Sequence, residues 1–262
     1  MSNVEESGTL HLDGMTFEEV SRAVAGGFDS IIIPCGAIEQ HGPHLPLSMD
    51  ADHADALAVE VATLLGHTLI APTIRVGCSK HHMAFPGTIS LQEETYTAIC
   101  HDYCVSLAKH GFKRIYLFSA HVGNFNALRA MLPALKEGVG PSTQVFAFTD
   151  HEAWLGGWRH AVEVAGGDPD SVGGHADIAE TSLMILLRPD TVRHASLVAG
   201  HVGMMTTEKL NLMWQNGVAA ISQNGVLGDA RGATCDIGRS CLNVIAKLLA
   251  SAFAAGAFEA LY

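Results

Sequence analysis

The feature that most constrains this chain is a short apolar run that leads directly into a segment rich in metal-ligand side chains. Residues 30–34 read Ser-Ile-Ile-Ile-Pro, which predicts a buried strand. Residues 36–50 follow, and they contain Glu39, His41 and Asp50. In open α/β sheets, ligands bind beyond the carboxyl ends of the strands. Because carboxylates and imidazoles together suit Zn, Mn or Fe, we expect a metal site at this edge.

The spacing within this segment indicates how its ligands are shared. Glu39 and His41 are two residues apart, so in an extended chain they project to the same side. They can reach one ion together, or each can reach one of two adjacent ions. Asp50 returns after a Pro-bounded turn, and a carboxylate can bridge two cations. The alternative, an exposed polar loop, does not explain why the segment leaves an Ile-rich strand.

Two further segments carry ligand-type residues. His121 follows residues 114–119, the clearest predicted strand, and so falls at the same edge of the sheet. His175 and Glu180 precede an apolar helical run at residues 183–187, where they can present one ligand and one proton-transfer group to a cleft. The alternative there is an ordinary helix cap, with Asp177 and Glu180 facing water.

Strands and helices alternate through the first 150 residues. Strands are predicted at residues 30–33, 68–71, 114–119 and 144–149. Helices are predicted at residues 16–25, 51–65, 90–110, 124–137, 150–165, 178–187, 207–223 and 235–255. This order predicts a layered α/β fold with a mostly parallel sheet flanked by helices. Since no linker interrupts it, we expect residues 1–262 to form a single domain.

The composition indicates which kinds of partner the protein can bind and in which cellular compartment it is expected. The chain is 48% hydrophobic and only 16% charged, so we expect part of its surface to be covered in a homo-oligomer. The net charge of −12 argues against binding nucleic acid or anionic membranes and leaves a small-molecule substrate. The acidic N-terminus does not resemble a signal peptide, and the six cysteines are expected to be reduced thiols in a cytoplasmic protein. Residues 244–262 are predicted to form a packed helix rather than a membrane span.

Residues 39–46, Glu-Gln-His-Gly-Pro-His-Leu-Pro, resemble the signature of the creatininase (creatinine amidohydrolase) family. The match continues through Asp50 and through residues 85–91, 121–124 and 175–182. The resemblance implies a layered α/β fold, a hydrolytic site with two metal ions, and ring-like homo-oligomers, with a hexamer favoured.

The resemblance also implies roles for individual residues. Glu39, Asp50 and His121 would hold one metal. His41, Asp50 and Glu180 would hold the other, with Asp50 as the bridge, and His175 would match the family's acid–base histidine. One position departs from the pattern, because creatinine-hydrolysing members carry Tyr-Glu where this chain has Val122 and Gly123. That glutamate is an additional metal-site ligand and catalytic group, so its absence makes creatinine a poor candidate substrate.

These observations predict a metal-dependent amidohydrolase that cleaves a non-peptide C–N bond in a cyclic amide or formamide. Two divalent ions per chain, Zn, Mn or Fe, would activate water, and His175 would move the proton. His44, His82 and Trp154 are candidate substrate contacts, although Trp154 can equally pack in a helix core. Two alternatives stay open: a lactone or C–C hydrolase using the same metals, and a metal-binding scaffold without turnover.

Overall fold

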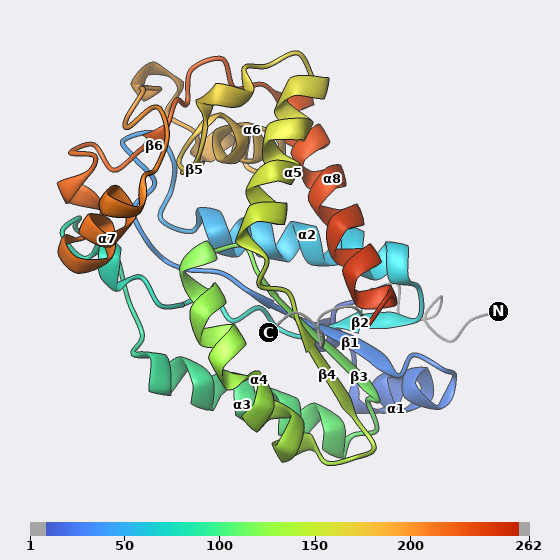
Figure 1. Ribbon diagram of the computed structural model, residues 1–262. Helices are drawn as coiled ribbons and strands as arrows, with labels where there is room; N and C mark the ends of the chain where they lie inside the picture. The colour runs from blue at the N-terminus through green and yellow to red at the C-terminus, as the bar shows by residue number, and fades with distance from the viewer. Residues whose placement is uncertain (1–8, 257–262) are drawn as a thin grey trace.

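The computed structural model describes residues 9–256 and contains a four-stranded parallel sheet (Figure 1). Its strands are β1 (Ser30–Cys35), β2 (Thr68–Ile70), β3 (Arg114–Ser119) and β4 (Gln144–Ala147), in the order β2-β1-β3-β4. β1 and β3 pair along their full lengths, from Ser30 opposite Arg114 to Cys35 opposite Ser119. The predicted α/β class and parallel sheet are therefore confirmed, with strand bounds close to those expected.

Side chains alternate between the two faces of the sheet, so each central strand supplies two cores. Ile32 and Phe118 pack on one face, whereas Ile31 and Leu117 pack on the other. The first face is covered by α2 (Met49–Leu65), α5 (His151–Val164), α6 (Ile178–Leu187) and α8 (Cys235–Ala254). The second is covered by α1 (Phe17–Ala25), α3 (Glu93–Lys109) and α4 (Phe125–Val139). Figure 1 shows these two helical layers on either side of the strands.

Local signals set several helix starts. Thr16 and Glu19 form a capping box at α1, in which each side chain accepts from the other residue's backbone N–H. α3 begins at Glu93, later than the predicted start at residue 90, and the Ser90 hydroxyl accepts from the backbone N–H of Ser79. α2 begins at Met49, two residues earlier than predicted, which places Asp50 in its first turn.

A second, smaller sheet was not predicted. β5 (Val172–His175) pairs antiparallel with β6 (Leu227–Gly228). β5 reads Val-Gly-Gly-His and β6 has two residues, so neither shows the apolar alternation by which strands are recognised. α7 (Thr207–Asn216) ends earlier than expected, because Gly217 turns the chain with a φ of 85°.

α8 is long and apolar enough to cross a membrane by length and composition alone. Its Ile237, Cys241, Ile245 and Leu249 are nevertheless buried in the core that α2, α5 and α6 share. This placement agrees with the predicted packed helix. The last part of that prediction, residues 257–262, lies outside the described residues.

Candidate metal centre

Residues predicted from three separate segments meet beyond the carboxyl ends of β1 and β3. One group follows β1, one follows β3, and one comes from β5 and the first turns of α6. Every member of the set is buried, which takes charged side chains out of water and demands a compensating partner. The set comprises Glu39, His41, Asp50, His121, His175 and Glu180.

Asp50 lies between two histidines. Its Oδ1 is 3.3 Å from Nε2 of His41, and its Oδ2 is 3.4 Å from Nδ1 of His121. Each oxygen thus faces a different ring, which is the arrangement a carboxylate needs to reach two neighbouring cations. His41 Nε2 also lies 3.6 Å from Oε2 of Glu180, and His121 Nδ1 lies 3.3 Å from Oε1 of Glu39.

Backbone carbonyls fix which nitrogen of each histidine faces the centre. Nδ1 of His41 is 3.1 Å from the carbonyl of Glu39, and Nε2 of His121 is 3.1 Å from the carbonyl of Cys78. A neutral ring donates its N–H to the carbonyl and keeps a lone pair on the other nitrogen. Such carbonyl contacts orient histidine ligands in many metal sites.

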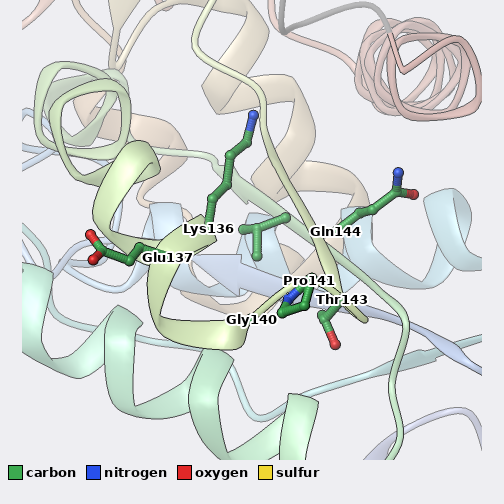
Figure 2. A pocket seen from close by; sticks show the side chains of 7 residues that line it. Lys136, Glu137, Gly140, Pro141, Thr143 and Gln144 are labelled. Carbon is green, nitrogen blue, oxygen red and sulfur yellow. The ribbon is translucent and has the colours of Figure 1, made fainter.

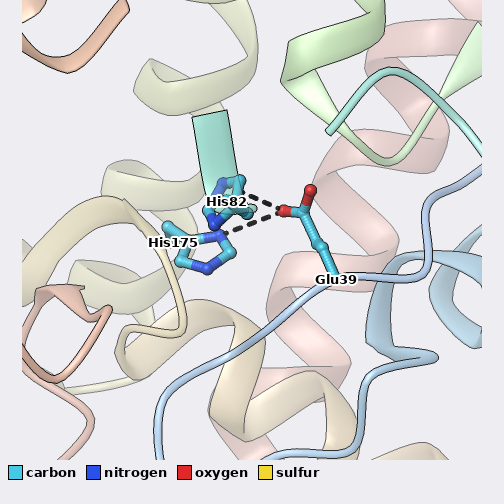
Figure 3. A group of neighbouring side chains, drawn as sticks. All are labelled: Glu39, His82 and His175. Atoms are coloured by element: carbon cyan, nitrogen blue, oxygen red, sulfur yellow. Dashed lines mark ion pairs between the residues drawn. The ribbon is translucent and has the colours of Figure 1, made fainter. Parts of the chain in front are cut away.

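Glu39 is also approached by two more rings, as Figure 3 shows. Its Oε1 lies 3.3 Å from Nε2 of His82 and 3.6 Å from Nδ1 of His175. Nε2 of His175 is 2.8 Å from the carbonyl of Gln40 and 2.9 Å from its side-chain amide nitrogen, so Gln40 holds this nitrogen and Nδ1 faces the centre. Nδ1 of His82 accepts from the Gln40 amide at 2.8 Å, which leaves the His82 proton on Nε2, directed at Glu39.

Several atoms of the centre make no hydrogen bond although they are fully buried. They are both carboxylate oxygens of Glu39, Oδ2 of Asp50 and Nε2 of His41. Leaving such atoms unpaired is costly unless a cation neutralises them. Ligand atoms of Glu39, His41 and Asp50 lie within 4.8 Å of one another, as do those of His41, His175 and Glu180. The donor set therefore fits divalent metal ions.

The charges of the centre are strongly coupled. Burial lowers the pKa of His41, but Asp50 and Glu180 outweigh it and raise the pKa to about 10. The pKa of His121 is likewise raised well above its usual value, mainly by Glu39 acting against burial. Burial raises the pKa of Glu180 well above the usual range. In the absence of metal ions, protons on these groups therefore neutralise the charge of the buried carboxylates.

The start of α6 is held rigidly toward the centre. Asp177 accepts from the backbone N–H groups of Ala179 and Glu180, and its second oxygen accepts from Gly173 and Gly174. Both Asp177 and Glu180 are buried, so the alternative in which they cap the helix while facing water is wrong. Asp177 is a cap, but an internal one that positions Glu180.

The three predicted substrate contacts lie in different places. His82 lies in the wall of the centre, beside Glu39 and His175. His44 is buried, with Nε2 2.9 Å from the hydroxyl of Thr181 on α6. Trp154 is 0% exposed and packs against Trp158 and Phe125, which is the core position that the sequence offered as the alternative.

Sequence reasoning missed an aromatic residue that does lie beside the centre. Trp214 on α7 is 49% exposed, and its ring centroid is 4.8 Å from that of His81. His81 in turn stacks on His121. In the sequence, Trp214 differs from its surroundings only as a tryptophan in the mostly polar segment of α7. It lies far along the chain from the segments that carry metal ligands.

The position of Gly123 is crowded by two imidazole rings. A Cβ atom at this position would lie 2.2 Å from Nε2 of His121 and 2.8 Å from Cε1 of His81. The two imidazoles already fill the space next to residue 123, so a side chain there requires both rings to move.

Two hollows of the surface lie elsewhere. One, of about 390 Å³, is lined by Lys136, Pro141 and Gln144 between α4 and β4 (Figure 2). Another, of about 780 Å³, includes Ser30, Thr68 and Arg114. Both lie at the amino ends of the parallel strands, the edge opposite the one that binds ligands in open α/β sheets.

Comparison with known proteins places this geometry in a family. A family model described as creatininase, creatinine amidohydrolase, matches residues 13–253. A mycofactocin precursor peptide peptidase of Mycobacterium ulcerans (strain Agy99) is 35% identical over 218 residues, 80% of this chain and 78% of the relative. A creatinine amidohydrolase of Pseudomonas putida is 30% identical over 196 residues, 71% of this chain and 75% of the relative.

A solved structure of a creatininase variant, described as the Zn–Zn type, shares the fold. Its TM-score is 0.73 at 24% identity, and the alignment covers 94% of this chain and 98% of that one. The family match spans nearly the whole chain and includes each segment that contributes to the centre. The protein is therefore a member of the creatininase family of amidohydrolases.

Proposed function

We propose that this protein hydrolyses an amide C–N bond with the help of two divalent metal ions. One ion would be held by Glu39, Asp50 and His121, and the other by His41, Asp50 and Glu180. The observation that carries the proposal is the position of Asp50, whose Oδ1 faces His41 and whose Oδ2 faces His121. Divalent ions bound there supply Lewis acidity, which activates water and polarises the carbonyl.

His175 is the proposed acid–base residue. The Gln40 carbonyl holds its Nε2, so Nδ1 is left to exchange a proton inside the centre. Burial and the neighbouring His41 lower the pKa of His175 to about 3 in the metal-free protein, which keeps the ring neutral. A neutral ring can accept the proton that the attacking water loses and return it to the leaving nitrogen.

A peptide-like amide is the first candidate substrate, because the Mycobacterium ulcerans relative, a precursor peptide peptidase, is 35% identical. The exposed Trp214 and Met83 near the short helix at Lys80–His82 offer apolar surface for such a chain. A cyclic amide or formamide, predicted from the sequence, is the second candidate. The Pseudomonas putida relative, named for its action on creatinine, favours it.

The test of this proposal measures metal content and activity on the same purified sample. Elemental analysis gives metal content per chain, and activity is then screened over peptides, cyclic amides, formamides and lactones. We expect about two ions per chain, and amide turnover that disappears with chelation and returns with metal. Turnover of lactones alone supports the lactone hydrolase. Metal without turnover of any substrate supports the scaffold.

A further inference from the structure

A further imidazole, that of His81, lies against the His121 side of the centre and has no assigned role. The 3-10 helix η2 (Lys80–His82) places the ring of His81 almost parallel to that of His121, at 12° and 5.7 Å between centroids. Ligand atoms of His81, His121 and Glu39 all lie within 4.8 Å of one another. This is the spacing of groups that can converge on one ion.

The surroundings hold His81 in this position. Trp214 packs against it at 4.8 Å between ring centroids, at 56° to its plane. Ser79, which precedes η2, is tied by its backbone N–H to the Ser90 hydroxyl at 2.9 Å. Gly123 has no side chain, and a Cβ there would lie 2.8 Å from Cε1 of His81. The missing side chain at residue 123 therefore makes room for the imidazole.

The chemistry of the ring also suits ligation. The His81 imidazole lies between His121 and Trp214, and imidazole nitrogens are common ligands of divalent metals. Within residues 9–256 neither ring nitrogen of His81 makes a hydrogen bond, whereas the neighbouring His82 accepts one from Gln40 and directs its proton at Glu39.

We infer that His81 is a further protein ligand of the ion held by Glu39, Asp50 and His121. The inference rests on the metal centre of the proposed function and refines it. With His81, this ion has two imidazole and two carboxylate ligands. Imidazole suits Zn, whereas Mn favours oxygen ligands, so His81 biases this position toward Zn.

The test compares His81→Phe with Trp214→Phe. The first keeps a ring between His121 and Trp214 but removes both nitrogen donors; the second alters the stack and leaves the donors. Each protein is loaded with Zn²⁺, Mn²⁺ or Co²⁺, and affinities are measured by competition with a chelator. We expect His81→Phe to weaken Zn²⁺ binding at one of the two positions by about 10–100-fold and to change the Co²⁺ absorption spectrum. Trp214→Phe should match the wild type in both.

X-ray absorption of the zinc-loaded wild type gives a second readout that needs no variant. His81, His121 and His41 provide three imidazoles for two ions, against two imidazoles without His81. Unchanged affinity and spectrum in His81→Phe, or two imidazoles in the wild type, overturns the inference and leaves the proposed function standing. A wild-type protein that binds no Zn²⁺, Mn²⁺ or Co²⁺ overturns the proposed function itself.

Discussion

His41 directs Nε2 at Oδ1 of Asp50 from 3.3 Å, because the carbonyl of Glu39 holds its other nitrogen. The second oxygen of Asp50 faces His121 at 3.4 Å. A single carboxylate thus belongs to both halves of the centre, whereas Glu180 lies 3.6 Å from His41 and belongs to that half. Removing Asp50 should therefore affect both metal positions, whereas removing Glu180 should affect only one.

Asp50→Ala should lose both metal ions, since one carboxylate serves two cations. Elemental analysis of the purified variant measures this directly. The matched control is Asp55→Ala, which removes a carboxylate from the same helix at a surface ion pair with Arg75. The control should keep its full metal content. Full occupancy in Asp50→Ala contradicts the dinuclear arrangement.

His175→Ala should retain its metals but lose turnover by roughly 10²–10⁴-fold, the usual effect of removing an acid–base group. The measurement pairs metal content with kcat on the best substrate of the screen. His160→Ala, an exposed histidine on α5, is the control. Loss of metal in His175→Ala, with the rate per bound metal preserved, would show that His175 is a ligand instead.

Metal binding should release protons and strengthen as the pH rises. In the metal-free protein the pKa of His41 is raised from 6.5 to about 10, so its contact with Asp50 stabilises the fold below pH 6.5 and this contribution disappears as the pH passes about 10. An ion that takes Nε2 must displace that proton. Calorimetry in buffers of different ionisation enthalpy measures the release. Affinity independent of pH between 7 and 9, with no proton release, contradicts the ligand role of His41.

Much of the fold could be predicted because its signals are local. The apolar runs at β1 and β3 and the helical periodicity of α6 required no knowledge of tertiary contacts. The ligand segments after β1 and β3 were found by the same logic, since parallel strands deliver their carboxyl ends to one edge. The roles of His175 and Glu180 at this edge were implied by the family resemblance, because β5 and α6 follow the predicted parallel strands and lie far along the chain from Glu39.

The remaining features depend on contacts between distant segments. Nothing local distinguishes Trp154, which is buried in the core, from Trp214, which contacts His81. The antiparallel pair β5 and β6 is made of glycines and very short strands, so it forms through pairing rather than intrinsic preference. The role of Gln40, which orients both His82 and His175, also appears only when three loops meet.

Trp154→Ala should destabilise the fold by roughly 3–5 kcal/mol, the cost of truncating a large buried aromatic side chain. Its ring is fully buried and contacts Trp158, Phe125 and Phe148. Denaturant unfolding of the metal-free protein measures the loss. Trp154→Phe keeps most of the packing and should keep both metals and turnover. A Trp154→Phe protein that is stable and metal-loaded but inactive would support Trp154 as the substrate contact predicted from the sequence.

Creatinine should be a poor substrate, with kcat/KM at least about 10²–10³-fold below that of the best amide, the typical cost of one missing electrostatic or acid–base group. Gly123 supplies no carboxylate, and the space beside it is filled by the rings of His121 and His81. His81 can take part in holding metal, but a neutral imidazole does not replace the charge of a glutamate near the substrate's ring nitrogen. The measurement is kcat/KM for creatinine, peptides, cyclic amides and formamides, all determined on enzyme loaded with the same metal. Creatinine turnover equal to that of the best amide would mean that another residue of the centre supplies the missing group. His82, which is hydrogen-bonded to Gln40 and lies beside Glu39, would be the first residue to replace.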